Sequence, residues 1–346
     1  MRLRRVLKGL RLVLGRRLNL FGMLKSRTDL EHYAAALRWI HNNTIENKGI
    51  CITNKRQAPY PEVSGYFIPS LLQFDEHELA VQYANWLVST QNANGSWSDG
   101  YNKVQYTFDT GQVLRGLLAL VDSHPHFKKP IEKACNWVVS QVEESGRIGT
   151  PNRSEWSSGW LPEGRVVPEA IHLYALEPIK QAGEKWQIDD YIQAVKRVLS
   201  YYLADEELTS FSTLCHFHAY IIEALVDLGY VDRARCGMEE VAHLQRSNGH
   251  VPAYRDVRWT CATGLFQYAV IWYKLGNIPL ADKSFSYACS LQNKSGGFVG
   301  GYGFGATYLP GEEISWAVKY FLDALWWKKK VHVKTDLAGA NTSLCR

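Results

Sequence analysis

Carboxyl, hydroxyl and amide side chains begin two apolar segments at spacings that suit acid/base chemistry. Glu62 and Tyr66 are four residues apart, and Asp109 and Gln112 are three apart. Residues at these spacings share one face of a helix. A carboxyl group among apolar neighbours has a raised pKa and can donate a proton, as glycoside cleavage requires. We therefore predict Glu62 and Asp109 as catalytic groups, the alternative being helix capping and dipole compensation.

A histidine and a tyrosine form a third candidate. His216 and Tyr220 are four residues apart in the segment HFHAYIIEAL. Such a pair can remove and return a proton, which is the work of a uronate lyase or a C5-epimerase. The alternative is a buried histidine that bonds only within the core. We predict His216 as the third catalytic residue.

Further polar and aromatic residues are predicted to bind substrate. Gln267 lies on an otherwise apolar helix and needs a polar partner. Arg165 precedes a predicted helix and suits a carboxylate, with a surface ion pair as the alternative. The predicted substrate-binding residues are Tyr66, Gln112, Trp160, Arg165, Tyr220, Gln267, Tyr302, Glu312 and Trp316.

No motif points to a metal or a cofactor. The seven cysteines include no CxxC pair, which argues against a zinc ribbon or a disulfide framework. The glycine-rich loop at 296–313 lacks the lysine of a phosphate-binding loop and follows no strand. We predict no cofactor, and reduced thiols in a cytoplasmic protein.

A repeated pattern of glutamine, glycine and an aromatic residue determines the predicted architecture. Its glutamines stand at 91, 141, 245 and 292, and degenerate copies fit 196–204 and 37–51. Six strongly apolar helical segments lie between the repeats, at 62–74, 109–121, 166–182, 212–228, 260–275 and 312–327. Exposed helices that alternate with buried ones predict an all-α protein, an (α/α)6 toroid with inner and outer rings.

The connections differ in length on the two faces of this predicted toroid. Those from outer to inner helices are mostly long, and long loops on one face usually carry function. The inner helices begin at the same face. Their free N–H groups and positive dipole ends favour an anionic ligand group there.

Charge is unevenly distributed along the 346 residues. Residues 1–28 contain nine basic and no acidic residues, whereas 29–327 have a net charge of −8. We therefore predict no nucleic-acid partner. We predict a basic amphipathic leader (1–28), whose residues 1–18 contact an anionic membrane surface, a toroid domain (29–327) and a basic disordered tail (328–346). The alternatives for the leader are docking to a partner protein and fraying.

The repeats resemble those of squalene-hopene cyclases and related prenyltransferase-type toroids. More closely, 60–72, 108–120, 216–225, 261–275, 296–308 and 314–325 resemble a bacterial branch of that superfamily associated with surface-polysaccharide gene clusters. The resemblance implies a toroid that works on a glycan or its lipid carrier. The chain lacks the DxDD motif of the cyclases, having only QIDD at 187–190, and lacks the zinc-ligand spacing of protein prenyltransferases.

These observations together predict a carbohydrate-active enzyme of bacterial surface-polysaccharide metabolism. Its substrate would be an anionic polysaccharide or lipid-linked glycan, and lyase, epimerase and hydrolase chemistry all remain open. One alternative is an isoprenoid-binding or terpenoid-cyclase-like enzyme, with an aromatic site and no carboxyl pair. Another is a non-catalytic scaffold for glycosyltransferases.

Overall fold

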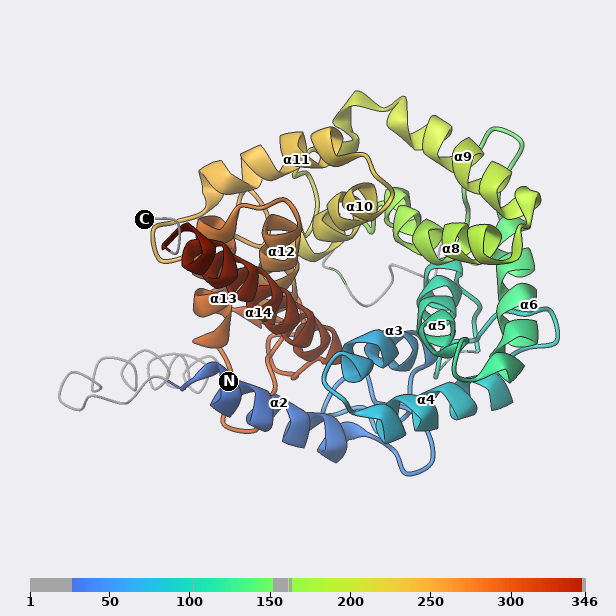
Figure 1. Ribbon diagram of the computed structural model, residues 1–346, viewed down its shortest axis with the longest axis horizontal. Coiled ribbons are helices and arrows are strands. Elements are labelled where there is room, and N and C mark those ends of the chain that lie inside the picture. The colour runs from blue at the N-terminus through green and yellow to red at the C-terminus, as the bar shows by residue number, and fades with distance from the viewer. Residues whose placement is uncertain (1–26, 102, 152–160, 162–163, 344–346) are drawn as a thin grey trace.

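The computed structural model describes residues 27–101, 103–151, 161 and 164–343, with side chains as far as 333. Two concentric rings of helices make up the molecule, and Figure 1 looks down their common axis. The inner ring consists of α3 (Pro61–Leu72), α5 (Thr107–Leu120), α8 (Leu176–Trp186), α10 (Cys215–Asp227), α12 (Ala262–Lys274) and α14 (Ser315–Ser343). The outer ring consists of α2 (Asp29–Asn43), α4 (His77–Ser89), α6 (Lys128–Val139), α9 (Asp189–Leu203), α11 (Val231–Leu244) and α13 (Ile278–Cys289). The predicted toroid is confirmed.

Burial distinguishes the two rings as the hydrophobic pattern predicted. In α12 every residue from Ala262 to Tyr273 is buried, because neighbours surround the helix on all sides. In α9 buried residues recur every three or four positions, which leaves the opposite face to water. Short 3-10 helices, η2 (Pro125–Phe127) and η4 (Glu206–Thr209), lie beside the outer ring.

Three of the four repeated glutamines, Gln91, Gln245 and Gln292, join neighbouring outer helices, whereas the Gln141 amide donates to Trp137 and Ser140 nearby in the chain. The Gln91 amide donates to the carbonyl oxygens of Gly95 and of Pro130 in α6, both at 2.9 Å. The last copy closes the ring, since the Gln292 amide donates to the carbonyl of His32 in α2 at 3.0 Å. The repeat therefore connects helices of the outer ring, and its glutamines do not contribute to the centre of the toroid.

The loops that enter the inner helices gather on one face, which we call the mouth. A two-stranded antiparallel sheet lies in these loops, in which β1 (Thr260–Cys261) pairs with β2 (Gly301–Tyr302). β1 leads directly into α12. The mouth therefore combines the long loops with the N-terminal ends of the inner helices.

Two predicted boundaries need correction. The third inner element begins as a 3-10 helix, η3 (Glu169–Ala175), before α8. The sixth inner helix begins at Ser315 and continues through Ser343, so disorder after 327 is the wrong prediction for 328–333. Lys328 there forms an ion pair with Asp29 at 2.7 Å. Residues 1–26 of the leader lie outside the described residues. None of the described helices is long and apolar enough to cross a membrane.

Candidate active site

Side chains from the inner helices meet on the toroid axis in two layers. Four helices each contribute a pair spaced i, i+4, with the first member nearer the mouth. These pairs are Glu62 and Tyr66 on α3, Phe108 and Gln112 on α5, His216 and Tyr220 on α10, and Trp316 and Tyr320 on α14. This spacing stacks the two members on one helix face. We call these residues, together with Asp109, Tyr174 and Gln267, the axial site.

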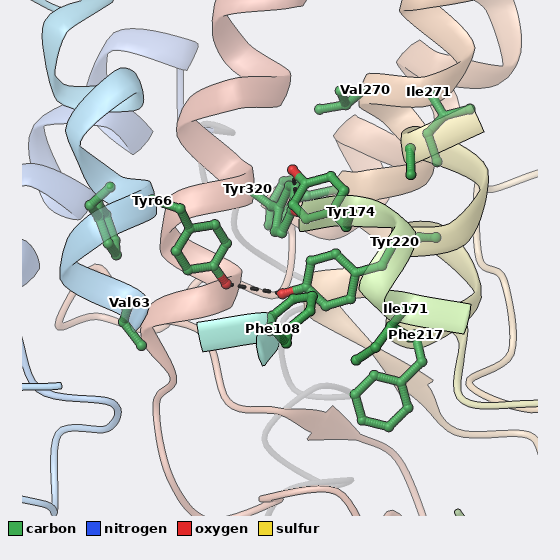
Figure 2. Packing of buried hydrophobic residues seen from close by; sticks show 14 of the residues in the cluster. Val63, Tyr66, Phe108, Ile171, Tyr174, Phe217, Tyr220, Val270, Ile271 and Tyr320 are labelled. Carbon is green, nitrogen blue, oxygen red and sulfur yellow. Dashed lines mark hydrogen bonds between the residues drawn. The ribbon is translucent and has the colours of Figure 1, made fainter. Parts of the chain in front are cut away.

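Four buried tyrosines form the deeper layer, which we call the tyrosine floor. The hydroxyls of Tyr66 and Tyr220 lie 3.1 Å apart, and the Tyr320 hydroxyl donates to that of Tyr174 at 2.9 Å. Figure 2 shows Tyr66 and Tyr220 directed toward one another, with the other two beside them. Burial raises the pKa of all four hydroxyls well above the ordinary value, so the floor is uncharged at neutral pH.

Two cationic side chains contact the rings of the tyrosine floor. The Lys319 ammonium lies 4.5 Å from the Tyr66 ring centre and 3.9 Å from that of Tyr320, and it pairs with Asp323 at 2.7 Å. The Arg115 guanidinium lies 4.5 Å from the Tyr174 ring centre. Two cations thus lie against the rings of the tyrosine floor.

Glu62 and Asp109 lie in the first turns of two closely packed helices, α3 and α5. Glycines permit this packing: a Cβ on Gly65 would lie 2.4 Å from the Val113 Cα, and a Cβ on Gly116 would lie 2.1 Å from the Gly65 carbonyl oxygen. Substitution at either glycine would force the helices apart. The glycines thus hold the two carboxyl groups near one another.

Each carboxyl group has a defined hydrogen-bond donor. The Trp316 indole N–H lies 3.1 Å from both carboxyl oxygens of Glu62. The Tyr60 hydroxyl donates to Asp109 Oδ2 at 2.9 Å. Neither bond is of the kind that caps a helix, and the two helices have no side-chain cap. Capping therefore does not account for these two residues.

Burial raises the pKa of both carboxyl groups. The pKa of Glu62 lies well above its ordinary value because of burial and the nearby charge of Asp109, while the Trp316 indole opposes the rise. Burial raises the pKa of Asp109 to about 7, with the Tyr60 hydroxyl opposing and the charge of Asp99 adding to the rise. Burial thus favours the protonated form of both groups, and Asp109 titrates near neutral pH.

An Asp109→Asn variant should make folding stability less dependent on pH. The folded pKa is raised, so the group stabilises the fold fully below its unfolded pKa of about 4, and this contribution is lost as pH rises to about 7. Asparagine remains an acceptor for Tyr60 and never ionises. Denaturant unfolding gives the free energy of unfolding of both proteins at pH 4 and pH 8. Relative to the wild type, the variant should be more stable at pH 8 than at pH 4 by roughly a few kcal/mol. An equal pH response in both proteins would contradict the shift.

His216 lies across the axial site in its neutral form. Its Nδ1 is 2.7 Å from the Gln267 side-chain oxygen. Burial lowers the pKa of His216 to about 4, with the Gln267 bond opposing and the charge of Lys319 adding to the fall. Its ring centre lies 4.6 Å from that of Tyr220 and 6.2 Å from that of Trp316. The imidazole therefore accepts protons weakly and is surrounded by aromatic rings.

Not every predicted binding residue joins the axial site. Arg165 donates to both carboxyl oxygens of Asp256, at 2.7 and 2.9 Å. This is the surface ion pair that the sequence offered as the alternative to substrate binding. The Tyr302 hydroxyl bonds to loop backbone, at the Leu291 carbonyl and the Val299 N–H. Their contact with substrate stays a prediction.

Glu312 and Trp160 are two further predicted residues that the structure does not place on the axis. Glu312 accepts from the Thr53 hydroxyl at 2.7 Å and precedes α14, whereas we had predicted it to begin that helix. Trp160 lies outside the described residues. Contacts link Glu62, Tyr66, Asp109, His216, Tyr220, Gln267 and Trp316 on the axis, whereas Gln112 donates to the Phe108 carbonyl of its own helix at 3.3 Å and its contact with substrate stays a prediction.

Sequence reasoning missed several aromatic neighbours of the site. Tyr320 follows Trp316 by four residues, so helical spacing alone was a sufficient signal. Tyr60 and Tyr308 come from connecting segments, and their proximity follows only from the closed ring. Tyr308 lies 6.1 Å from His216 between ring centres. Among the residues that the structure describes, no cluster of three or more histidine, cysteine, aspartate or glutamate side chains is placed to hold a metal ion.

The chain has sequence similarity to one known family. Residues 56–209 match the squalene-hopene cyclase C-terminal domain. This segment contains the inner helices α3, α5 and α8 and the outer helices α4, α6 and α9. A comparison with curated proteins gave no match.

Solved structures with the same architecture act on different substrates. An α-amylase from Clostridium perfringens has a TM-score of 0.64 at 12% identity, covering 86% of this chain and 97% of its own. An unsaturated glucuronyl hydrolase specific for heparin has a TM-score of 0.66 at 11% identity, covering 88% of this chain and 97% of its own. A type II terpene cyclase from Scytonema, in complex with geranylgeranyl dihydroxybenzoate, has a TM-score of 0.58 at 14% identity, covering 87% of this chain and 97% of its own. At these identities the likeness establishes the fold alone.

Proposed function

We propose that this chain, an α/α toroid with repeats of the squalene-hopene cyclase type, is an enzyme that cleaves a glycan by acid/base chemistry at the axial site. The observation that carries the proposal is the pair of buried carboxyl groups, Glu62 and Asp109. Burial raises the pKa of both, and the charge of Asp109 raises that of Glu62 further. Two carboxyl groups in unlike states are what glycoside hydrolysis requires.

The two carboxyl groups have separate roles in this proposal. Glu62 keeps its proton and donates it to the departing glycosidic oxygen, while the Trp316 indole fixes the orientation of its carboxyl group. Asp109 acts as the carboxylate, which stabilises the positively charged sugar or activates water. The Tyr60 hydroxyl favours this ionised form by donating to it.

Hydrolysis is better supported than lyase or epimerase chemistry. Those reactions remove a proton from carbon, and His216 is the candidate base. Its pKa of about 4 makes it a weak base, which suits recognition more than carbon deprotonation. We therefore assign Asp109, and not His216, to the base.

The substrate class follows from the setting of the carboxyl pair. Aromatic rings with hydroxyl groups line the axis, and they suit the apolar faces and hydroxyls of a sugar. We propose a polysaccharide or lipid-linked glycan of bacterial surface-polysaccharide metabolism. A cytoplasmic location, an anionic substrate and membrane contact through residues 1–18 remain predictions.

An isoprenoid substrate is the second candidate, favoured by the match to the squalene-hopene cyclase C-terminal domain and by the aromatic rings. Cyclisation of this type begins when an acid protonates a carbon–carbon double bond, which demands a strong acid. Burial makes Glu62 and Asp109 weaker acids than usual. A glycosidic oxygen is more basic and matches such donors better.

The experiment is turnover of a panel of neutral and uronate-containing oligosaccharides, free and lipid-linked, by the full chain. New reducing ends indicate hydrolysis, and ultraviolet absorbance of unsaturated products indicates a lyase. Prenyl diphosphates and squalene form the isoprenoid arm. Turnover in that arm alone, or activity retained in both Glu62→Gln and Asp109→Asn, would overturn the proposal.

Activity should fall as pH drops below about 7. Asp109 must be ionised, so protonation through its raised pKa removes the active form. Replacing Tyr60 with phenylalanine removes the hydroxyl that favours the ionised form, so this acid limb should move to higher pH. The measurement is kcat/KM against pH for the two proteins. An acid limb that stays in place would show that Asp109 does not control it.

A further inference from the structure

Two buried thiols lie against one another where α10 and α12 begin. Cys215 is the first residue of α10, and Cys261 is the N-cap residue of α12. Their side chains are almost completely covered, at 1% and 0% exposed. The Cys215 thiol donates a hydrogen bond to the Cys261 sulfur. Glycine permits this approach, because a Cβ on Gly264, in the first turn of α12, would lie 2.2 Å from Cys215 Sγ.

The start of α12 makes the Cys261 sulfur an acceptor of hydrogen bonds. Burial by itself raises the pKa of Cys261, but the bonds donated by the Cys215 thiol and by the N–H groups of Gly264 and Thr263 outweigh burial, so the pKa of Cys261 is lowered. Burial raises the pKa of Cys215, and its bond to Cys261 adds to the rise. The pair therefore joins a sulfur that favours the thiolate to a neighbouring sulfur that keeps its proton.

Two other buried cysteines show that burial alone does not produce this arrangement. Cys135 and Cys289 lie in the second halves of α6 and α13, where the backbone N–H groups already bond within the helix. Burial raises the pKa of both thiols. They are ordinary buried thiols, which oxidants attack slowly, and they serve as internal controls for Cys261.

We propose that Cys215 and Cys261 are a redox-active dithiol, which hydrogen peroxide oxidises to a disulfide between the starts of α10 and α12. The Cys261 thiolate attacks one peroxide oxygen, the O–O bond breaks, and the sulfur becomes a sulfenic acid. The hydroxide that leaves takes up the proton that Cys261 had released. The Cys215 sulfur then attacks the Cys261 sulfur, the S–S bond forms, and the sulfenic hydroxyl leaves with the Cys215 proton as water. The two thiols lose two electrons, and one peroxide becomes two water molecules.

The disulfide forms beside the axial site. Cys215 directly precedes His216 in α10. Tyr308 lies between the two places: its ring centre is 6.1 Å from that of His216, and its pKa is raised by burial first and then by the charge of Cys261. Cys261 also ends β1, which pairs with β2 in the mouth. Hydrogen peroxide is nearly as small as water, which reaches buried polar sites in folded proteins.

The test follows the thiols of the full chain. Reduced, folded protein is exposed to hydrogen peroxide and then unfolded in an alkylating reagent, and peptide mass spectrometry locates any disulfide. A second sample is unfolded before the peroxide is added. Dimedone, which traps sulfenic acids, is applied to Cys215→Ala and to Cys261→Ala. Cys135→Ala is the matched control for the loss of a buried thiol.

In the folded wild type, two of the seven thiols should be lost together, in a disulfide between Cys215 and Cys261 that dithiothreitol reverses. Cys215→Ala should carry dimedone on Cys261, because its sulfenic acid has no second thiol to react with, whereas Cys261→Ala should leave Cys215 unlabelled. Cys135→Ala should form the disulfide at the wild-type rate.

Two results would overturn the inference. One is a folded protein in which Cys215 and Cys261 stay reduced while the exposed Cys236 is oxidised. The other is a disulfide that forms only in the sample unfolded beforehand. Neither measurement depends on whether the protein cleaves a glycan.

Discussion

Replacing Glu62 with glutamine should lower glycan turnover by about 10²–10⁴-fold, the usual contribution of a general acid. The variant loses only the proton that the mechanism transfers. Glutamine has the same shape and still accepts from the Trp316 indole. Because burial favours the neutral form of Glu62, folding stability should change little. Turnover and thermal unfolding measured on the same preparation check both parts.

A second buried carboxyl group provides the matched control. Glu223, elsewhere on the inner ring, accepts from the Lys274 ammonium at 2.9 Å. Glu223→Gln removes one charge of a buried ion pair, so it should destabilise the fold while leaving turnover of the folded fraction nearly unchanged. Equal losses of turnover in Glu62→Gln and Glu223→Gln would mean that Glu62 acts only through stability.

Replacing Gly296 with alanine should destabilise the protein by about 3 kcal/mol or more. Its φ of +101° is strained for any residue with a side chain. The added Cβ would also lie 1.9 Å from the Ala35 carbonyl oxygen in α2. This contact joins the last repeat to the first outer helix, so the substitution acts on the closure of the ring. Chemical denaturation gives the free energy of unfolding.

A second glycine separates backbone strain from the lost contact. Gly276 has a φ of +82°, and a Cβ there would have no neighbour within 4 Å. Gly276→Ala should therefore cost only the backbone strain, about 1–2 kcal/mol. If both variants lose the same free energy, packing of the repeat against the next outer helix does not hold the ring closed.

Helical spacing made much of the axial site predictable. Glu62 with Tyr66 and His216 with Tyr220 were found because residues four apart must share a helix face, whatever surrounds the helix. The loop residues show the limit of that reasoning. Tyr302 and Arg165 were chosen for their chemistry, yet backbone bonds and Asp256 engage them in the structure. A loop has no periodicity from which the direction of a side chain follows.

The helix ends show a similar limit. The sequence predicted an inner helix from 312 to 327, and the structure has it from Ser315 to Ser343. A run of lysines after Trp327 was interpreted as a disordered tail. Lys328 instead pairs with Asp29 at the start of α2, a partner almost three hundred residues away in the chain. Such a contact exists only after the ring has closed.

The sequence by itself determined the alternation of inner and outer helices that the described residues form, and it supplied Glu62 and Asp109 as candidates, because each depends on local spacing or on a repeat. Only the tertiary structure decided that Glu62 lies beside Asp109 and that His216 pairs with Gln267 while His218 does not. Both pairings join different inner helices, and the closed ring fixes which helix faces meet. Burial on the axis then shifts the pKa values, and from these shifts the proposed chemistry follows.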